Sequence, residues 1–173
     1  VLLLAGDHIY KMDYGAMLAA HAESEADMTI GCLEVPLDQA KAFGVMSVDE
    51  SGRIIDFNEK PENPESTPNC DDVALASMGI YVFGGASMFD ALEGDAADFG
   101  KEIIPSLVEK KDIRCHVFDD YWEDIGTVRS FFEANLQLTD DFPAFDFYEE
   151  GHPIYNYPDL LPTAKLGDCS LNR

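Results

Sequence analysis

The fold class of this chain is defined most clearly by its opening stretch, Val1-Leu2-Leu3-Leu4-Ala5-Gly6-Asp7. Five consecutive apolar residues that end at a glycine and an acid are typical of a strand buried on both faces of a parallel sheet. Open α/β sheets bind ligands beyond the carboxyl ends of such strands, so Asp7 is a candidate site residue. From its position alone, Asp7 is equally suited to accepting hydrogen bonds from the amides of the turn.

Helical and strand patterns alternate outward from this run, which predicts an α/β fold. Asp13 is a candidate N-cap for a helix that buries Met17 and Leu18. Thr127 is a candidate N-cap for a later helix, whose apolar stripe consists of Val128, Phe131, Phe132 and Leu136. Strands are expected at 28–35, 44–48, 53–59, 80–83 and 114–118. Further helices are expected at 86–92 and after Asp98, a candidate N-cap, and Pro105 should kink or delay the second of them.

The composition is that of a folded domain with an acidic surface. The 173 residues are 46% hydrophobic and 11% aromatic, which suits one domain with a core and argues against disorder. No apolar run approaches the ~20 residues of a membrane-spanning helix. The 34 acidic and 11 basic residues give a formal net charge of −23, so neither nucleic acid nor a membrane is expected as a partner.

The cysteines and the absent motifs exclude several classes of protein. Cys32, Cys70, Cys115 and Cys169 form no CxxC pair and no dense disulfide pattern, so a zinc site is not expected and a cytoplasmic location is the default. The sequence contains no GxxxxGK[ST] loop, no GxSxG elbow and no HExxH motif. P-loop NTPases, the usual α/β-hydrolases and zincin proteases are therefore excluded.

The pattern changes after Asp141. Residues 142–164 combine prolines and aromatic residues without a helical or strand period, which predicts an extended linker after a domain spanning residues 1–141. Residues 165–173 are a candidate start of a further unit. Because the sequence opens inside an apolar run, without an initiator Met or the flanks of a signal peptide, we expect an internal fragment of a longer protein.

Two further side chains are candidates for phosphate chemistry. Asp124 lies in a tight turn before a predicted helix, where it would hold a cation or simply favour the helix dipole. Lys60 ends a predicted strand before Pro61, where it would bind a phosphate or pair with a neighbouring glutamate. Asp7 and Asp124 are 117 positions apart, so only the fold can bring them together.

The remaining candidates carry weaker signals. Gly44, Ser77 and Gly79 adjoin predicted strands, where glycine permits close approach of a ligand but more often marks a turn or bulge. His8 could be a general base beside Asp7 or a structural histidine. Glu59 could accept hydrogen bonds from sugar hydroxyls or be solvated.

Several stretches together resemble the sugar-nucleotide pyrophosphorylases, and most closely the bacterial glucose-1-phosphate adenylyltransferases (ADP-glucose pyrophosphorylases). The resemblance covers nearly the whole chain in the family's order, whereas Glu-Lys-Pro alone would be a weak signal. The stretches are Leu3-Leu4-Ala5-Gly6-Asp7-His8-Ile9-Tyr10-Lys11-Met12-Asp13-Tyr14, Ala42-Phe43-Gly44-Val45-Met46, Phe57-Asn58-Glu59-Lys60-Pro61, Leu75-Ala76-Ser77-Met78-Gly79-Ile80-Tyr81-Val82-Phe83, Asp98-Phe99-Gly100-Lys101 and Tyr121-Trp122-Glu123-Asp124-Ile125-Gly126-Thr127.

The resemblance implies a fold and an assembly. The fold would be a Rossmann-like nucleotidyltransferase domain with a mixed, mainly parallel central sheet, incomplete at its N-terminus. Residues 165–173 would begin a left-handed β-helix domain. The full-length protein would be an allosteric homotetramer that makes ADP-glucose for glycogen or starch synthesis.

It also implies roles for individual residues. Asp7 and Asp124 would bind Mg²⁺, while Lys60 would hold the phosphate of glucose 1-phosphate and Glu59 its sugar. Three residues, Gly44, Ser77 and Gly79, would line the glucose side, together with Trp122, for which a core role is as plausible. ATP would be the second substrate.

Two departures from the family pattern leave alternatives open. The family's Gly-rich nucleotide loop with its arginine is absent from this sequence, and of the C-terminal left-handed β-helix at most the first strand is present, from Lys165. The fragment is therefore not expected to be active alone. The rival functions are a pyrophosphorylase that uses UTP, dTTP or GTP, and a non-catalytic regulatory subunit of the same fold. The regulatory reading predicts loss of the acids or the lysine, all of which are present here.

Overall fold

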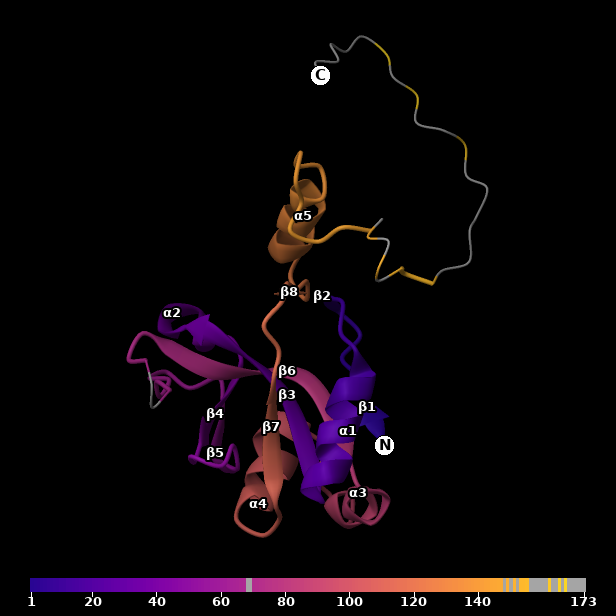
Figure 1. The fold of residues 1–173 in the computed structure, drawn as a ribbon. Helices are drawn as coiled ribbons and strands as arrows, with labels where there is room; N and C mark the ends of the chain where they lie inside the picture. The colour runs from indigo at the N-terminus through magenta and orange to yellow at the C-terminus, as the bar shows by residue number, and fades with distance from the viewer. Residues whose placement is uncertain are drawn as a thin grey trace.

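The larger of the two sheets organises the fold (Figure 1). The computed structural model describes residues 1–67, 70–147, 149, 151, 153–155, 162, 165 and 167. The strands of this sheet follow the order β5-β4-β6-β3-β7, and β1 pairs with β6 beside this path. Their bounds are β1 Leu2–Leu3, β3 Met28–Pro36, β4 Gly44–Val48, β5 Ile54–Glu59, β6 Val73–Phe83 and β7 Ile113–Val117.

The strand directions confirm a mixed α/β fold but correct its detail. β3 and β7 pair in parallel, whereas the described pairings of β6 with β1, β3 and β4, and of β4 with β5, are antiparallel. A mainly parallel sheet is therefore wrong for this part of the chain. Parallel pairing needs a long crossover, usually a helix, and the only helix described between β3 and β6 is the four-residue α2, Leu37–Ala40.

The opening apolar run also differs from the expectation. It forms only the two-residue β1, and Val1 and Leu4 remain 61% and 44% exposed. Burial on both faces was therefore a wrong prediction. β1 pairs with β6 on one side, through Leu2 opposite Val82 and Leu3 opposite Tyr81.

A bulge in β6 divides the sheet into two halves. Gly31 lies opposite Ile80 but Cys32 lies opposite Ser77, so Met78 and Gly79 are additional residues in β6. Gly79 has φ +66°, a left-handed conformation that glycine adopts without steric cost. Beyond the bulge β6 pairs with β1, and before it with β4.

Alternate residues of β6 enter two different cores. Leu75, Tyr81 and Phe83 pack in the core beneath α4, Ile104–Val108. Met78 and Ile80 pack with Met17 of α1, Tyr14–Ser24, on the other face. This two-residue alternation is the periodicity of a strand covered on both sides.

The helix boundaries follow the predicted caps. Asp13 accepts a hydrogen bond from the N–H of Gly15 at the start of α1, although Leu18 is 41% exposed and was wrongly expected in the core. Asp98 accepts from the N–H of Lys101 at the start of a π-helical turn, Phe99–Ile103. Regular helix resumes in α4, with Pro105 in its first turn, as the delay at this proline predicted. Helix α3 spans Gly85–Ala91.

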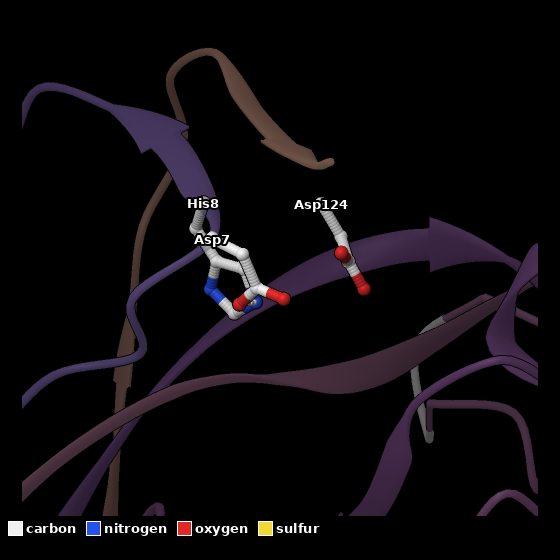
Figure 2. A group of neighbouring side chains, drawn as sticks. All are labelled: Asp7, His8 and Asp124. Atoms are coloured by element: carbon white, nitrogen blue, oxygen red, sulfur yellow. Dashed lines mark ion pairs between the residues drawn. The ribbon is translucent and has the colours of Figure 1, made fainter. Parts of the chain in front are cut away.

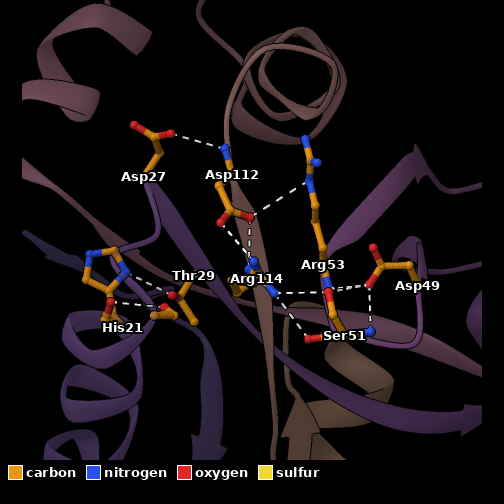
Figure 3. Close-up of polar contacts among 9 residues, drawn as sticks. His21, Asp27, Thr29, Asp49, Ser51, Arg53, Asp112 and Arg114 are labelled. Carbon is orange, nitrogen blue, oxygen red and sulfur yellow. Dashed lines mark hydrogen bonds and ion pairs between the residues drawn. The ribbon is translucent and has the colours of Figure 1, made fainter.

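A polar network ties β7 to the β4–β5 turn (Figure 3). Arg114 Nε and Nη2 donate to the two carboxylate oxygens of Asp112 at 2.8 and 2.9 Å. Its Nη1 also donates to the carbonyl oxygen of Ser51 at 3.2 Å. These contacts are structural, since none of the three residues lines the site described below.

A separate two-stranded sheet holds the segments that matter for function. β2, His8–Tyr10, pairs antiparallel with β8, Trp122–Asp124, and α5, Val128–Gln137, follows directly (Figure 1). The predicted cap Thr127 is confirmed, because its side chain accepts from the N–H of Ser130. The apolar stripe of α5 is exposed, however, with Val128 at 89% and Phe132 at 60%.

The tail after α5 is described only in part. Within 142–147, 149, 151 and 153–155 the chain has no helix or strand. The expected β-helix start at 165–173 lies almost entirely outside the described residues. Among the described helices, none has the length and apolar composition that crossing a lipid bilayer requires.

Candidate active site

The ladder between β2 and β8 brings Asp7 and Asp124 together. His8 lies directly opposite Asp124 in this ladder, and the N–H of Ile125 donates to the carbonyl oxygen of Asp7 at 3.0 Å. The two acids, distant in sequence, therefore occupy neighbouring strand ends (Figure 2). Asp7, His8 and Asp124 each offer one possible metal-ligand atom, and these three atoms lie within 4.8 Å of one another.

Gly126 makes room for both carboxylates. A Cβ atom at this position would lie 3.0 Å from Asp124 Oδ1 and 3.1 Å from Asp7 Oδ2. The N–H of Gly126 donates to Asp124 Oδ1 at 2.7 Å, which orients that carboxylate. Two carboxylates converging on one point are a suitable donor set for a hard divalent cation such as Mg²⁺.

The side chains of His8 and Trp122 pack next to this acidic cluster. The two rings meet edge to face, with centroids 4.9 Å apart, and His8 Nε2 lies 3.7 Å from Asp7 Oδ1. His8 Nδ1 and Trp122 Nε1 are buried and have no hydrogen-bond partner among the described residues. Gly79 packs against the same histidine, since a Cβ there would lie 3.3 Å from His8 Cε1.

Lys60 lies on the wall of the same cavity as the two acids. This cavity has a volume of about 680 Å³, and Lys60 is the only lysine or arginine among its described lining residues. Lys60 has φ +50°, and its N–H donates to the carbonyl oxygen of Phe43 at 3.0 Å. A left-handed backbone conformation is uncommon for lysine, and the surrounding chain holds this residue in place at the end of β5.

Glu59 occupies a different place from Lys60. It does not line the cavity but packs against two glycines, where a Cβ would lie 2.9 Å (Gly44) and 2.6 Å (Gly100) from Glu59 Oε2. Burial raises the pKa of Glu59, the nearby Lys60 lowers it, and Asp98 raises it. Glu59 is the last residue of β5, whereas Lys60 follows the strand with a left-handed backbone, so the two side chains face different surroundings.

Ser77 and Gly79 also lie outside the cavity lining. The N–H of Gly79 donates to Ser77 Oγ at 3.2 Å, which stabilises the β6 bulge. Burial raises the pKa of Tyr81, while a hydrogen bond with Ser77 lowers it and the charges of Glu59 and Asp98 raise it. Ser77 and Glu59 therefore share a second polar group with Tyr81 and Asp98.

The sequence interpretation missed several residues of both groups. Gly100 packs against Glu59, and the charges of Glu59 and Asp98 act on Tyr81; these residues were quoted in family stretches without a role in the site. Only Gly100 carried a local signal, since a glycine just after a helix cap permits close approach. The other cavity residues come from two stretches, 33–43 and 123–130, which no sequence spacing connects: Leu33, Glu34, Val35, Pro36, Gln39, Ala42, Phe43, Glu123, Gly126, Thr127 and Ser130.

The fold and this acidic cluster define an α/β domain with a candidate cation site, and comparison with known proteins identifies its family. The family model for nucleotidyl transferases matches residues 1–141. The chain therefore belongs to the nucleotidyl transferase family.

Curated relatives confirm the narrower resemblance. The chain is 50% identical to a glucose-1-phosphate adenylyltransferase of Methylobacillus flagellatus, over 96% of this chain and 43% of that protein. Proteins of the same name from Nitrosococcus oceani and Dechloromonas aromatica are 51% and 48% identical, over 96% of this chain and 43% and 41% of their own lengths. The chain thus spans less than half the length of these relatives.

Proposed function

We propose that this chain carries the metal- and sugar-phosphate-binding part of a glucose-1-phosphate adenylyltransferase. Such an enzyme converts ATP and glucose 1-phosphate into ADP-glucose and pyrophosphate. The observation that carries the proposal is the convergence of Asp7 and Asp124 at Gly126, in a cavity that Lys60 also lines. The names of the relatives support the choice of substrates.

The reaction requires two polyanions to meet. A phosphate oxygen of glucose 1-phosphate attacks the α-phosphorus of ATP, a new P–O bond forms, and the bond to the departing pyrophosphate breaks. Such transfer depends on positioning and charge stabilisation more than on covalent chemistry by the protein. In a chain of net charge −23, the location of each cation is decisive.

Asp7 and Asp124 would hold Mg²⁺, and the N–H of Gly126 already orients one of these carboxylates. When bound, Mg²⁺ neutralises phosphate charge and stabilises the leaving pyrophosphate. Lys60 would bind the phosphate of glucose 1-phosphate and hold its attacking oxygen. Its left-handed backbone fixes the direction in which the side chain leaves β5.

The sugar would lie between the cavity and the group around Glu59. Glu59 would accept hydrogen bonds from sugar hydroxyls, and Ser77 would contribute a further polar atom. Gly44 and Gly79 would keep this region free of side chains, and Trp122 would form the wall between the sugar and the metal site. The tight approach of Gly44 and Gly100 to Glu59 supports a fixed orientation for this carboxylate.

The cellular setting completes the proposal. We infer a cytoplasmic, allosterically regulated homotetramer that supplies glycogen synthesis, as the resemblance to the bacterial glucose-1-phosphate adenylyltransferases implies. The linker at 142–164 would connect the nucleotidyltransferase domain to a β-helix domain that begins at 165–173.

Substrate profiling of the full-length protein tests the proposed function. Pyrophosphate release should be fastest with ATP and glucose 1-phosphate, and it should require Mg²⁺. Faster turnover with UTP, dTTP or GTP would overturn the choice of base. No turnover with any nucleotide, in protein that is folded, would favour a regulatory subunit.

A further inference from the structure

The β2–β8 ladder is too small to be stable by itself. Each strand has three residues, and the pair forms a sheet separate from the main one. An isolated two-stranded ribbon is marginally stable in water. Since the proposed metal ligands lie at one end of this ribbon, other contacts must hold it in register.

The opposite end of the ribbon meets the chain that follows α5. Tyr10 pairs with Trp122 at this end, so Lys11 leaves β2 and Tyr121 enters β8 here. Phe145 contacts both flanking residues: its ring centroid lies 5.7 Å from that of Tyr121 and 5.3 Å from Lys11 Nζ.

Phe145 is buried although its neighbours are not. It is 8% exposed, whereas Phe142 is 96% exposed and Phe147 is 49% exposed. The ring of Phe147 packs edge to face against it at 5.4 Å. A single aromatic side chain is therefore the apolar anchor of this segment.

Lys11 adds polar contacts to the same anchor. Its Nζ forms an ion pair with Glu149 Oε2 at 3.0 Å and donates to the carbonyl oxygen of Asp146. The Lys11 side chain is only 17% exposed, so these contacts are partly shielded from solvent. The segment 145–149 is thus fastened to the residue that follows β2.

We propose that Phe145 is a positioning residue for the acidic cluster. Its docking against Tyr121 and Lys11 closes the far end of the β2–β8 ladder. This keeps His8 opposite Asp124 and maintains the spacing of Asp7 and Asp124. The catalytic consequence rests on the proposed function, whereas the stabilisation of the ladder does not.

The test compares Phe145→Ala with Phe142→Ala in the full-length protein. Hydrogen exchange read by mass spectrometry should be about tenfold faster in peptides covering β2 and β8 of Phe145→Ala, and unchanged in peptides covering β3 and β6. Phe142→Ala should leave both regions unchanged, and Phe145→Leu should restore most of the protection.

Mn²⁺ binding, followed by electron paramagnetic resonance, provides the second readout. Binding should weaken severalfold in Phe145→Ala and recover in Phe145→Leu. The positioning role would be overturned if exchange in β2 and β8 were unchanged, or if it rose equally in β3 and β6. It would also be overturned if exchange in β2 and β8 rose while the Mn²⁺ affinity stayed the same. A wild-type protein that binds no Mn²⁺ would instead refute the metal assignment, and exchange would still decide whether Phe145 holds the ladder.

Discussion

The N–H of Ile125 donates a 3.0 Å hydrogen bond to the carbonyl oxygen of Asp7, and this backbone contact joins the two segments that carry the acidic residues. The contact does not depend on either carboxylate. Side-chain substitutions at Asp7 and Asp124 can therefore remove charge while the backbone arrangement is kept. This property makes the site suitable for quantitative tests.

Gly126→Ala should disturb the site without disturbing the fold. The added Cβ would lie about 3 Å from an oxygen of each acid, closer than ordinary contact, so the two carboxylates must move apart. We expect the Mg²⁺ concentration for half-maximal activity to rise by about tenfold, as estimated from losses on misplacing metal ligands. Titration of activity with Mg²⁺ measures this effect.

Gly85→Ala is the matched control, because a Cβ at this position of α3 meets nothing within 4 Å. It should leave the Mg²⁺ dependence unchanged. An equal response of the two variants would show that the effect at Gly126 is not local.

Lys60→Gln should weaken binding of the sugar phosphate. Lys60 is the only cation among the described residues that line the cavity, so its loss leaves the phosphate opposed by carboxylates. The half-saturation concentration of glucose 1-phosphate should rise by about ten- to a hundredfold, with a smaller change for ATP. Lys41→Gln, at an exposed position, should behave like wild type. An unaltered value in Lys60→Gln contradicts the phosphate role.

Glu59→Gln should change the pH dependence of stability. Burial, the largest cause, raises the pKa of Glu59, so the folded state binds its proton more tightly than the unfolded state. The contribution of Glu59 is therefore present below its ordinary pKa near 4.5 and is lost as pH rises through the folded value. The free energy of unfolding of Glu59→Gln, measured relative to that of wild type, should therefore be higher at about pH 7 than at about pH 4. Denaturant unfolding of both proteins at the two pH values measures this free-energy difference. The same difference between variant and wild type at both pH values would argue against burial of the charge.

Arg114→Ala should lower stability without changing catalysis. The substitution removes a two-pronged contact with Asp112 and a hydrogen bond to Ser51. Because these groups are partly exposed, the expected loss of unfolding free energy is about 1 kcal/mol. Arg129→Ala removes an exposed pair with Glu133 and should cost less than about 0.5 kcal/mol. A changed half-saturation for either substrate in Arg114→Ala would mean that the network reaches the site.

Local signals in the sequence identified the fold elements well. The caps Asp13, Asp98 and Thr127 form the expected hydrogen bonds, because capping depends on neighbours within three residues. The burial of Leu18 was predicted wrongly, and the apolar stripe of α5 is exposed. Helical periodicity shows which residues share a face but not whether another element covers it.

The site was predictable only in part, because its residues are brought together by tertiary contacts. The turn positions of Asp7 and Asp124 marked them as candidates, but only the β2–β8 ladder brings them together. The separation of Glu59 from the cavity, and the approach of Gly100 to it, depend on tertiary packing that no spacing encodes.

Binding of Mn²⁺ to Asp7→Asn, Asp124→Asn and the double variant, measured by electron paramagnetic resonance on the full-length protein, tests the shared cation site most directly. If both acids hold one ion, either substitution removes most of the bound signal and the second adds little to the first. Two independent, additive losses, or binding that survives both substitutions, would contradict a single site formed by these two residues.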